Sequence, residues 1–181
     1  PYYLSHDSAF ELHNMLTRPV TTVTITSPRR LDNRIVLKVP YRFIYAPKEK
    51  IWGISSIWVT PSEQVQVSDM ERTILDGLAR PELCSGISEV ATGLWMRKDD
   101  LDWEKIILYV QKLRSLVVAK RLGYLLELYG LGFPYIDQLQ EMIGASYALL
   151  DPMLPAEGAY LARWRLRINV DTDTLKGIVT T

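Results

Sequence analysis

A change of pattern at residue 68 is the feature that most constrains the fold. Before it, residues 20–67 are rich in β-branched and aromatic residues, in runs such as VTTVTIT and RIVLKV. Such runs are typical of strands with one buried face, and the prolines between them predict turns. From Ser68 onward, apolar residues recur at helical spacing instead. Strands followed by helices predict an α+β domain, with helices on one face of a mainly antiparallel sheet.

A short helix is expected at residues 5–16, before the strands, and about five helices are expected after residue 68. The ranges predicted for these five are 69–79, 86–96, 102–113, 115–129 and 134–143. Residues 147–150 predict a short strand, and RWRLRINV at 163–170 is the clearest strand in the chain. The polar residues 171–181 predict a poorly ordered tail, so the expected domain covers residues 1–170.

Three helix starts carry recognisable capping residues. Ser68 and Glu71 have the spacing of a capping box, in which each side chain accepts from the other residue's amide. Asp102 is the expected cap of the helix at 102–113, and Ser85 that of the helix at 86–96. Glu71 is therefore interpreted as a structural residue.

Composition narrows the classes of protein. The 21 basic and 21 acidic residues balance, but residues 1–50 carry eight basic and four acidic side chains and residues 51–110 carry five and ten. The first segment therefore favours an anionic partner and the second a cationic one. The single cysteine excludes an intramolecular disulfide and is consistent with a reducing compartment. No apolar run approaches the ~20 residues of a membrane span and no signal peptide is visible, so a cytoplasmic protein without membrane partners is expected.

Candidate catalytic residues do not assemble into a recognisable motif. Glu71 and Asp76 lie about 140° apart around their helix, so they do not share a face. His6 and His13 share a face but lack the further ligands that a metal needs. Cys84 has no base near it in the sequence, so the turn Cys84-Ser85-Gly86 is interpreted as a helix start. We therefore expect no catalytic residue, no metal and no cofactor, and a protein that is not an enzyme.

One enzymatic alternative stays open. A metal-dependent, nuclease-like protein could assemble its carboxylates only through the fold. Glu71, Asp76 and Glu89, in the acidic segment 51–110, are the candidates.

The strand at 163–170 carries the most distinctive surface pattern. Arg163, Arg165 and Arg167 alternate with apolar residues, so one face packs and the other presents guanidinium groups ~7 Å apart. That face fits a nucleic-acid backbone or an acidic protein. It fits equally a solvated surface that is salt-bridged to the acidic segment 51–110.

Two further features are less specific. Arg29 and Arg30, with Arg34 and Lys38 after the turn, form a second basic patch. The helix at 115–129 has a broad apolar face that suits the core or a partner interface. Gly123 lies in its middle and costs about 1 kcal/mol relative to alanine, which indicates close packing of another backbone there.

The stretch VSDMERTILDGLARPELCSGISEVATGL resembles the C-terminal domain of the AbiEi family of antitoxins. These proteins belong to type IV bacterial toxin–antitoxin systems linked to abortive phage infection. PYYLSHDSAFELHNML resembles the opening helix of that domain, AKRLGYLLELYG its Arg-Leu-Gly helix, and YALLDP with RWRLRINV its ending. The resemblance covers residues 2–170.

The resemblance implies a function. The full protein would be a DNA-binding transcriptional autorepressor whose N-terminal winged helix reads operator repeats. The region represented here would carry the antitoxin activity, and the partner would be a nucleotidyltransferase toxin encoded beside it, with or without direct binding. The winged helix is absent from the 181 residues, which puts sequence-specific DNA binding by this region in doubt.

Overall fold

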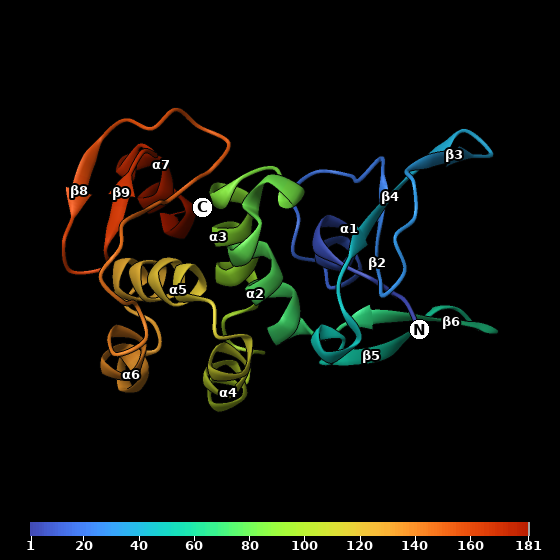
Figure 1. Cartoon of the computed structure of the whole chain (residues 1–181), viewed down its shortest axis with the longest axis horizontal. Helices are drawn as coiled ribbons and strands as arrows, with labels where there is room; N and C mark the ends of the chain where they lie inside the picture. The colour runs from blue at the N-terminus through green and yellow to red at the C-terminus, as the bar shows by residue number, and fades with distance from the viewer. Residues whose placement is uncertain (181) are drawn as a thin grey trace.

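Two sheets lie at opposite ends of the molecule with helices between them, as the computed structural model, which describes residues 1–180, shows (Figure 1). The larger sheet has six strands in the order β3-β4-β2-β1-β6-β5. The smaller sheet has three strands in the order β7-β9-β8. The structure contains both α-helices and β-sheets, so the α+β class predicted from the sequence is confirmed.

The six-stranded sheet is mixed, with β1–β6 and β2–β4 parallel and the other three pairings antiparallel. Antiparallel pairings predominate, as predicted from residues 20–67, but the parallel pairing of β2 with β4 was not anticipated, and the prediction was incomplete. It missed β1, a strand of two residues that is too short to show alternation and that lies between β2 and β6. The strands are β1 Tyr3–Leu4, β2 Val23–Ser27, β3 Arg34–Val36, β4 Val39–Tyr45, β5 Ile54–Thr60 and β6 Glu63–Ser68.

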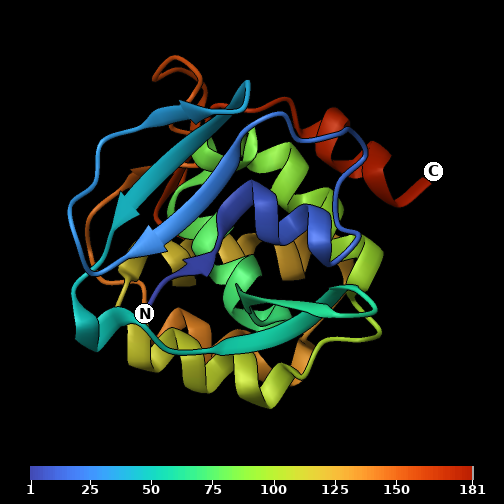
Figure 2. The same ribbon diagram turned by 90° about the vertical axis from the view of Figure 1, so that its right-hand side faces the viewer.

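Residues 1–180 contain seven α-helices, and five of them match the five helices predicted after residue 68. Helix α1 lies between the β2–β4 strands and the β5–β6 hairpin (Figure 2). Four short 3-10 segments, η1–η4, complete the chain: Lys48–Lys50, Pro81–Cys84, Phe133–Tyr135 and Ile178–Thr180. The helices are α1 His6–Leu12, α2 Met70–Ala79, α3 Ile87–Arg97, α4 Trp103–Leu113, α5 Leu116–Tyr129, α6 Ile136–Gln140 and α7 Thr172–Gly177.

Helix α2 is central to the core. Every residue from Glu71 to Leu78 is buried, because α1, α3, α4 and α5 all pack against this helix. Ile74, Leu75 and Leu78 supply its apolar contacts and are fully buried. Burying side chains of this size contributes roughly 1.5–3 kcal/mol each.

The late strand predicted at 163–170 is shorter than expected and belongs to the small sheet. Only Leu166–Ile168 forms β9, which pairs in parallel with β7 (Ala148–Leu149) and antiparallel with β8 (Ala159–Leu161). Arg163–Arg165 form a turn, in which Arg165 has a left-handed φ of 51°. A left-handed residue interrupts extended backbone, so the strand begins only after it.

Trp164 explains the glycine in the middle of α5. The indole is 1% exposed, and a Cβ at position 123 would overlap its six-membered ring. The indole N–H donates to Glu127 Oε2 at 2.9 Å. Gly123 therefore makes room for a side chain, whereas the sequence had indicated close packing of another backbone.

Residues 172–177 form helix α7, in contrast to the poorly ordered tail that polarity predicted for 171–181; residue 181 lies outside the described residues. The Asp171 carboxylate caps the helix by accepting from the amide of Asp173 at 3.1 Å. Leu175 is fully buried, and the Tyr129 hydroxyl donates to its carbonyl at 2.9 Å. One buried leucine, inconspicuous in the sequence, attaches the segment to the core.

Substituting Gly123→Ala tests the packing of Trp164. Alanine gains about 1 kcal/mol in helix propensity, so a net loss of stability isolates the overlap with the indole. We expect unfolding free energy to fall by about 1–3 kcal/mol in urea titrations. Gly177→Ala, at the last residue of α7, is the control: no atom lies within 4 Å of its added Cβ, so stability should stay unchanged or rise by up to about 1 kcal/mol. Equal stability of wild type and Gly123→Ala would contradict the assignment.

Candidate nucleic-acid and partner interface

The capping box predicted for Ser68 and Glu71 does not form. Helix α2 begins one residue later than that box requires, with Asp69 Oδ1 accepting from the amide of Arg72 at 2.8 Å. Ser68 ends β6, and its hydroxyl bonds to that of Thr73 at 2.7 Å. The shift places Arg72, and not a glutamate, at the position from which a side chain reaches back.

Glu71 acts between helices instead. Its Oε1 accepts from the amide of Asp102 at 2.9 Å and its Oε2 from Lys105 Nζ at 2.9 Å, so it stabilises the start of α4. Asp102 is the cap of α4, as predicted, accepting from the amide of Lys105 at 3.1 Å. Burial opposes the charge on Lys105, but the bonds to Glu71 and Asp69 outweigh it and raise the pKa of Lys105.

Arg72 and Asp76 form a buried ion pair, with Arg72 Nε 2.8 Å from Asp76 Oδ1 and both side chains less than 10% exposed. The same guanidinium donates to the carbonyls of Lys50 and Trp52, each at 3.0 Å, and stacks over the Trp52 ring at 4.2 Å. These bonds tie the loop before β5 to the central helix.

The three carboxylates named for a nuclease-like site have separate partners. Glu71 binds Lys105, Asp76 binds Arg72, and Glu89 Oε1 accepts from the Thr17 hydroxyl at 3.2 Å. Within residues 1–180, no group of three His, Cys, Asp or Glu side chains is arranged to hold a metal ion.

The histidines and the cysteine have structural contacts. His13 Nε2 donates to the Ser68 carbonyl at 2.7 Å, and His6 Nδ1 bonds to the Ser5 hydroxyl at 2.9 Å. Burial lowers the pKa of His6 and raises the pKa of Cys84 well above its usual value. A buried thiol of raised pKa is a poor nucleophile.

The helix start after Cys84 is capped from a distance. Gly86 is the N-cap of α3, in place of the predicted Ser85, whose hydroxyl accepts from Arg18. Asp151 Oδ2 accepts from the amide of Ile87 at 3.0 Å. The cap therefore comes from the segment after β7, which local sequence patterns cannot reveal.

The three arginines of the late strand differ in environment. Arg163 lies in the turn and its Nε is 2.8 Å from both carboxylate oxygens of Glu127, in α5. Its partner thus lies outside the acidic segment 51–110. Arg165 and Arg167 form no ion pair with a carboxylate anywhere in residues 1–180.

Arg165 and Arg167 instead contact two tyrosines. The Arg165 guanidinium lies 5.5 Å from the Tyr147 ring centroid and that of Arg167 lies 4.9 Å from the Tyr160 ring centroid. The two rings meet edge to face at 5.2 Å. These four residues are called the tyrosine–arginine surface below.

The tyrosine–arginine surface is accessible and positively charged. Tyr147 is 40% exposed and Tyr160 63%. Arg167 Nε donates to the Gly158 carbonyl at 3.2 Å, which positions the guanidinium without neutralising it. Burial, and then the charges of Arg121 and Arg165, lower the pKa of the nearby Lys120. Guanidinium groups beside exposed rings can contact phosphates and stack against bases.

Arg29 and Arg30 lie in the loop after β2, beside the six-stranded sheet. The Arg30 guanidinium lies 4.2 Å from the Tyr45 ring centroid, and that of Arg34 lies 5.3 Å from the Phe43 ring centroid. The predicted basic patch therefore also combines cations with aromatic rings.

The tyrosines and Phe43 were missed as candidate residues. Tyr147 directly precedes β7, Tyr160 lies in β8 and Arg167 in β9, so their proximity depends on the pairing of the small sheet. The one available signal was the period of two on β4, which places Tyr41, Phe43 and Tyr45 on one face.

Comparison with known proteins places the fold. No family model matches the chain, and no curated protein does. The crystal structure of RV2827C protein from Mycobacterium tuberculosis superposes with a TM-score of 0.69 at 14% sequence identity. The match covers 99% of this chain and 66% of that chain, so this chain spans just under two thirds of the neighbour's length. At this identity the likeness concerns the fold alone.

Among residues 1–180, no helix combines the length and hydropathy of a membrane span.

The bond between Tyr109 and Asp69 predicts a pH dependence. Burial, and then the 2.7 Å bond to Asp69 Oδ2, raise the pKa of Tyr109 to about 12. The pKa of an unfolded tyrosine is about 10. The stabilisation that Tyr109 gives the folded state is therefore complete below that pH and is lost as pH rises towards 12. The stability difference between wild type and Tyr109→Phe, measured by urea unfolding, should therefore shrink from pH 9 to 12. A Tyr2→Phe control should show no such trend, since Tyr2 is 67% exposed; a constant Tyr109 difference would contradict the linkage.

Proposed function

We propose that this chain is the antitoxin and regulatory region of an AbiEi-like transcriptional autorepressor that acts in the cytoplasm. It would counteract a nucleotidyltransferase toxin in a phage-defence system. The resemblance of residues 2–170 to that family motivates the proposal. The tyrosine–arginine surface is the structural observation that supports it, because it offers cationic and aromatic groups for a phosphate backbone.

The tyrosine–arginine surface would supply contacts that do not depend on sequence. In the full-length protein a winged helix would read the operator, and Arg165 and Arg167 would bind neighbouring phosphates. Each guanidinium is held against a ring, so less side-chain freedom is lost when it binds. Neutralising phosphates releases counterions, which makes this share of the affinity depend on salt.

The segments that carry the resemblance supply buried contacts that hold the tyrosine–arginine surface in position. In KRLGYLLELYG, Arg121 NH2 donates to the Leu149 carbonyl at 2.9 Å, and Gly123 accommodates Trp164 just before β9. VSDMERTILDGL contributes Asp69, Arg72 and Asp76, which organise the central helix. On this proposal the motifs preserve the scaffold, and the exposed residues around it carry the interactions.

Growth rescue tests the antitoxin role. We expect co-expression of residues 1–181 with the nucleotidyltransferase encoded by the neighbouring gene to restore growth that the enzyme alone arrests. The folded but destabilised Gly123→Ala variant should rescue in proportion to its remaining level, measured by immunoblot. A toxic neighbour that neither this chain nor the full-length protein relieves would refute the antitoxin role.

The DNA contact is tested separately in the full-length protein. Replacing Arg165 and Arg167 by alanine should reduce the slope of log K against log salt by about 1.8, at about 0.9 for each lost phosphate contact. Lys176→Ala, an exposed lysine on α7, is the matched control and should leave the slope unchanged. An unchanged slope in the double variant would remove these arginines from the DNA interface without affecting the rescue experiment.

A further inference from the structure

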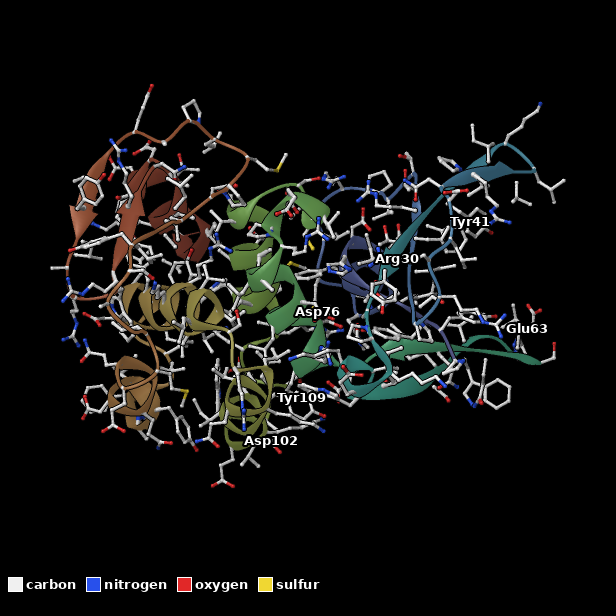
Figure 3. The ribbon with its side chains drawn as sticks, viewed as in Figure 1. Arg30, Tyr41, Glu63, Asp76, Asp102 and Tyr109 are labelled. Atoms are coloured by element: carbon white, nitrogen blue, oxygen red, sulfur yellow. The ribbon has the colours of Figure 1, made fainter. Side chains whose placement is uncertain are left out.

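One face of the six-stranded sheet is left open over β2, β3 and β4. Along β2, Thr24 and Thr26 are buried, whereas Ile25 points to the opposite face and pairs in register with Phe43 of β4. The period of two then places Tyr41 on the same face as Ile25 and Phe43. We call this the open face. In Figure 3, Tyr41 and Arg30 are labelled beside the strands of the large sheet, whereas Asp76 and Tyr109 are labelled beside the helices.

The open face contains a hollow of about 620 Å³. This volume lies in the range that holds a large side chain or a small ligand. Most of its wall is aliphatic or aromatic, including Tyr2, Ile25, Leu31, Val36, Tyr41 and Phe43.

Uncompensated positive charge borders the hollow. Arg29 and Arg34 line it directly, and Arg30 lies beside them over Tyr45. None of the three forms an ion pair within residues 1–180. The nearest acidic residue in sequence, Asp32, offers Arg34 only its backbone carbonyl, at 3.4 Å. A ligand that fits needs apolar groups for the wall and carboxylates for the arginines.

The neighbouring edge of the sheet is open as well. Strand β3 has one neighbour, β4, and ends the sheet. Ile35 lies opposite Pro40, which has no N–H, so the pair cannot exchange hydrogen bonds and the polar groups of Ile35 point outward. Ile35 is 73% exposed and Leu37, at the hairpin tip, 93%. Such an edge is suited to receive a further strand.

The tip of this hairpin is strained. Leu37 and Lys38 have left-handed φ values of 49° and 67°, in a two-residue turn where asparagine and glycine are usual. A left-handed backbone is unfavourable for both residues, because it brings Cβ too close to the following carbonyl oxygen. Within this chain the exposed Leu37 gains no burial that offsets the cost.

We propose that the open face and the β3 edge bind an extended segment of a partner protein that carries an apolar side chain and acidic side chains two residues apart, on one face. An apolar side chain would occupy the hollow, carboxylates would pair with Arg29, Arg30 and Arg34, and the backbone would add to β3. This is a protein-binding site in addition to the nucleic-acid contact proposed above, and it does not depend on that contact.

The surface favours this occupant over two others. Aromatic residues and arginine are enriched at protein interfaces, whereas nucleic-acid interfaces are more polar than the aliphatic wall formed here. A symmetric pairing of two β3 edges would bring Arg34 and Lys38 of one copy towards those of the other. Like charges facing across an interface oppose that arrangement.

The test measures binding of a defined peptide to residues 1–181. The probe is a fluorescein-labelled peptide of about nine residues with a central tryptophan, glutamates two and four residues to either side of it, and threonine at the intervening positions, so that tryptophan and glutamates share a face. We expect a rise in anisotropy with a dissociation constant below about 100 μM, and no rise with the lysine counterpart. Reversing Arg29 and Arg34 to glutamate should weaken the acidic peptide at least about tenfold, about 1.4 kcal/mol, and allow the lysine peptide to bind.

A matched pair of tryptophan variants localises the site. Val36→Trp fills the hollow from its edge and should weaken binding at least about tenfold. Val59→Trp on β5 is the control, because Val59 is 44% exposed and Val36 45%, and should bind within about twofold of wild type. Circular dichroism verifies that both variants are folded.

Three outcomes would overturn the proposal. The acidic peptide binds neither wild type nor control at about 1 mM. A single-stranded oligonucleotide binds wild type more tightly than the peptide does, and Val36→Trp weakens that binding, which would assign the face to nucleic acid. The chain dimerises in sedimentation experiments and Val36→Trp prevents it, which would assign the face to a second copy.

Discussion

The ion pair between Arg72 and Asp76 is the interaction on which the two halves of the molecule depend. It is buried, so the attraction is strong, and the guanidinium also satisfies two carbonyls in the loop that leads into β5. Helix α2, which carries the pair, contacts four other helices. Removing one partner would leave a charge without compensation in the interior, which typically costs 3–5 kcal/mol. The β-rich half and the helical half are therefore joined by polar bonds as well as by apolar packing.

The small sheet is attached by a second set of long-range contacts. Arg121 NH1 donates to the Leu78 carbonyl at 2.7 Å, at the C-terminal end of α2, and the same side chain bonds to Leu149 in β7. Burial lowers the pKa of Arg121 to about 10, yet the group is cationic at neutral pH, where it complements the negative helix end. Trp164 over Gly123 and Asp151 at the start of α3 complete the attachment. These contacts fix the position of the tyrosine–arginine surface. The polar groups that make them are buried in the scaffold, whereas the cation–aromatic groups of that surface remain accessible.

Much of the local structure could be predicted because it depends on neighbouring residues. The periodicity of 69–79, 102–113 and 115–129 identified α2, α4 and α5 to within one residue at each end, and Asp102 was recognised as a cap. The errors share one cause. Glu71, Ser85 and Leu175 were interpreted from adjacent residues. The partner of Glu71 lies in α4, and that of Ser85 lies in a loop more than 60 residues away in sequence. Leu175 packs in the core. The candidate site was half predicted: the arginines were named, and the rings beside them were not.

The sequence by itself determined the α+β class, the order of most elements and the positions of the arginines, because alternation, helical spacing and charge are local properties. Tertiary structure alone decided which arginines stay uncompensated: Arg163 meets Glu127, while Arg165 and Arg167 meet tyrosines. It also decided that β1 enters the middle of the large sheet and that the face over β2–β4 stays open. Each of these depends on residues brought together across long stretches of chain, where contact is set by packing and no local pattern records it.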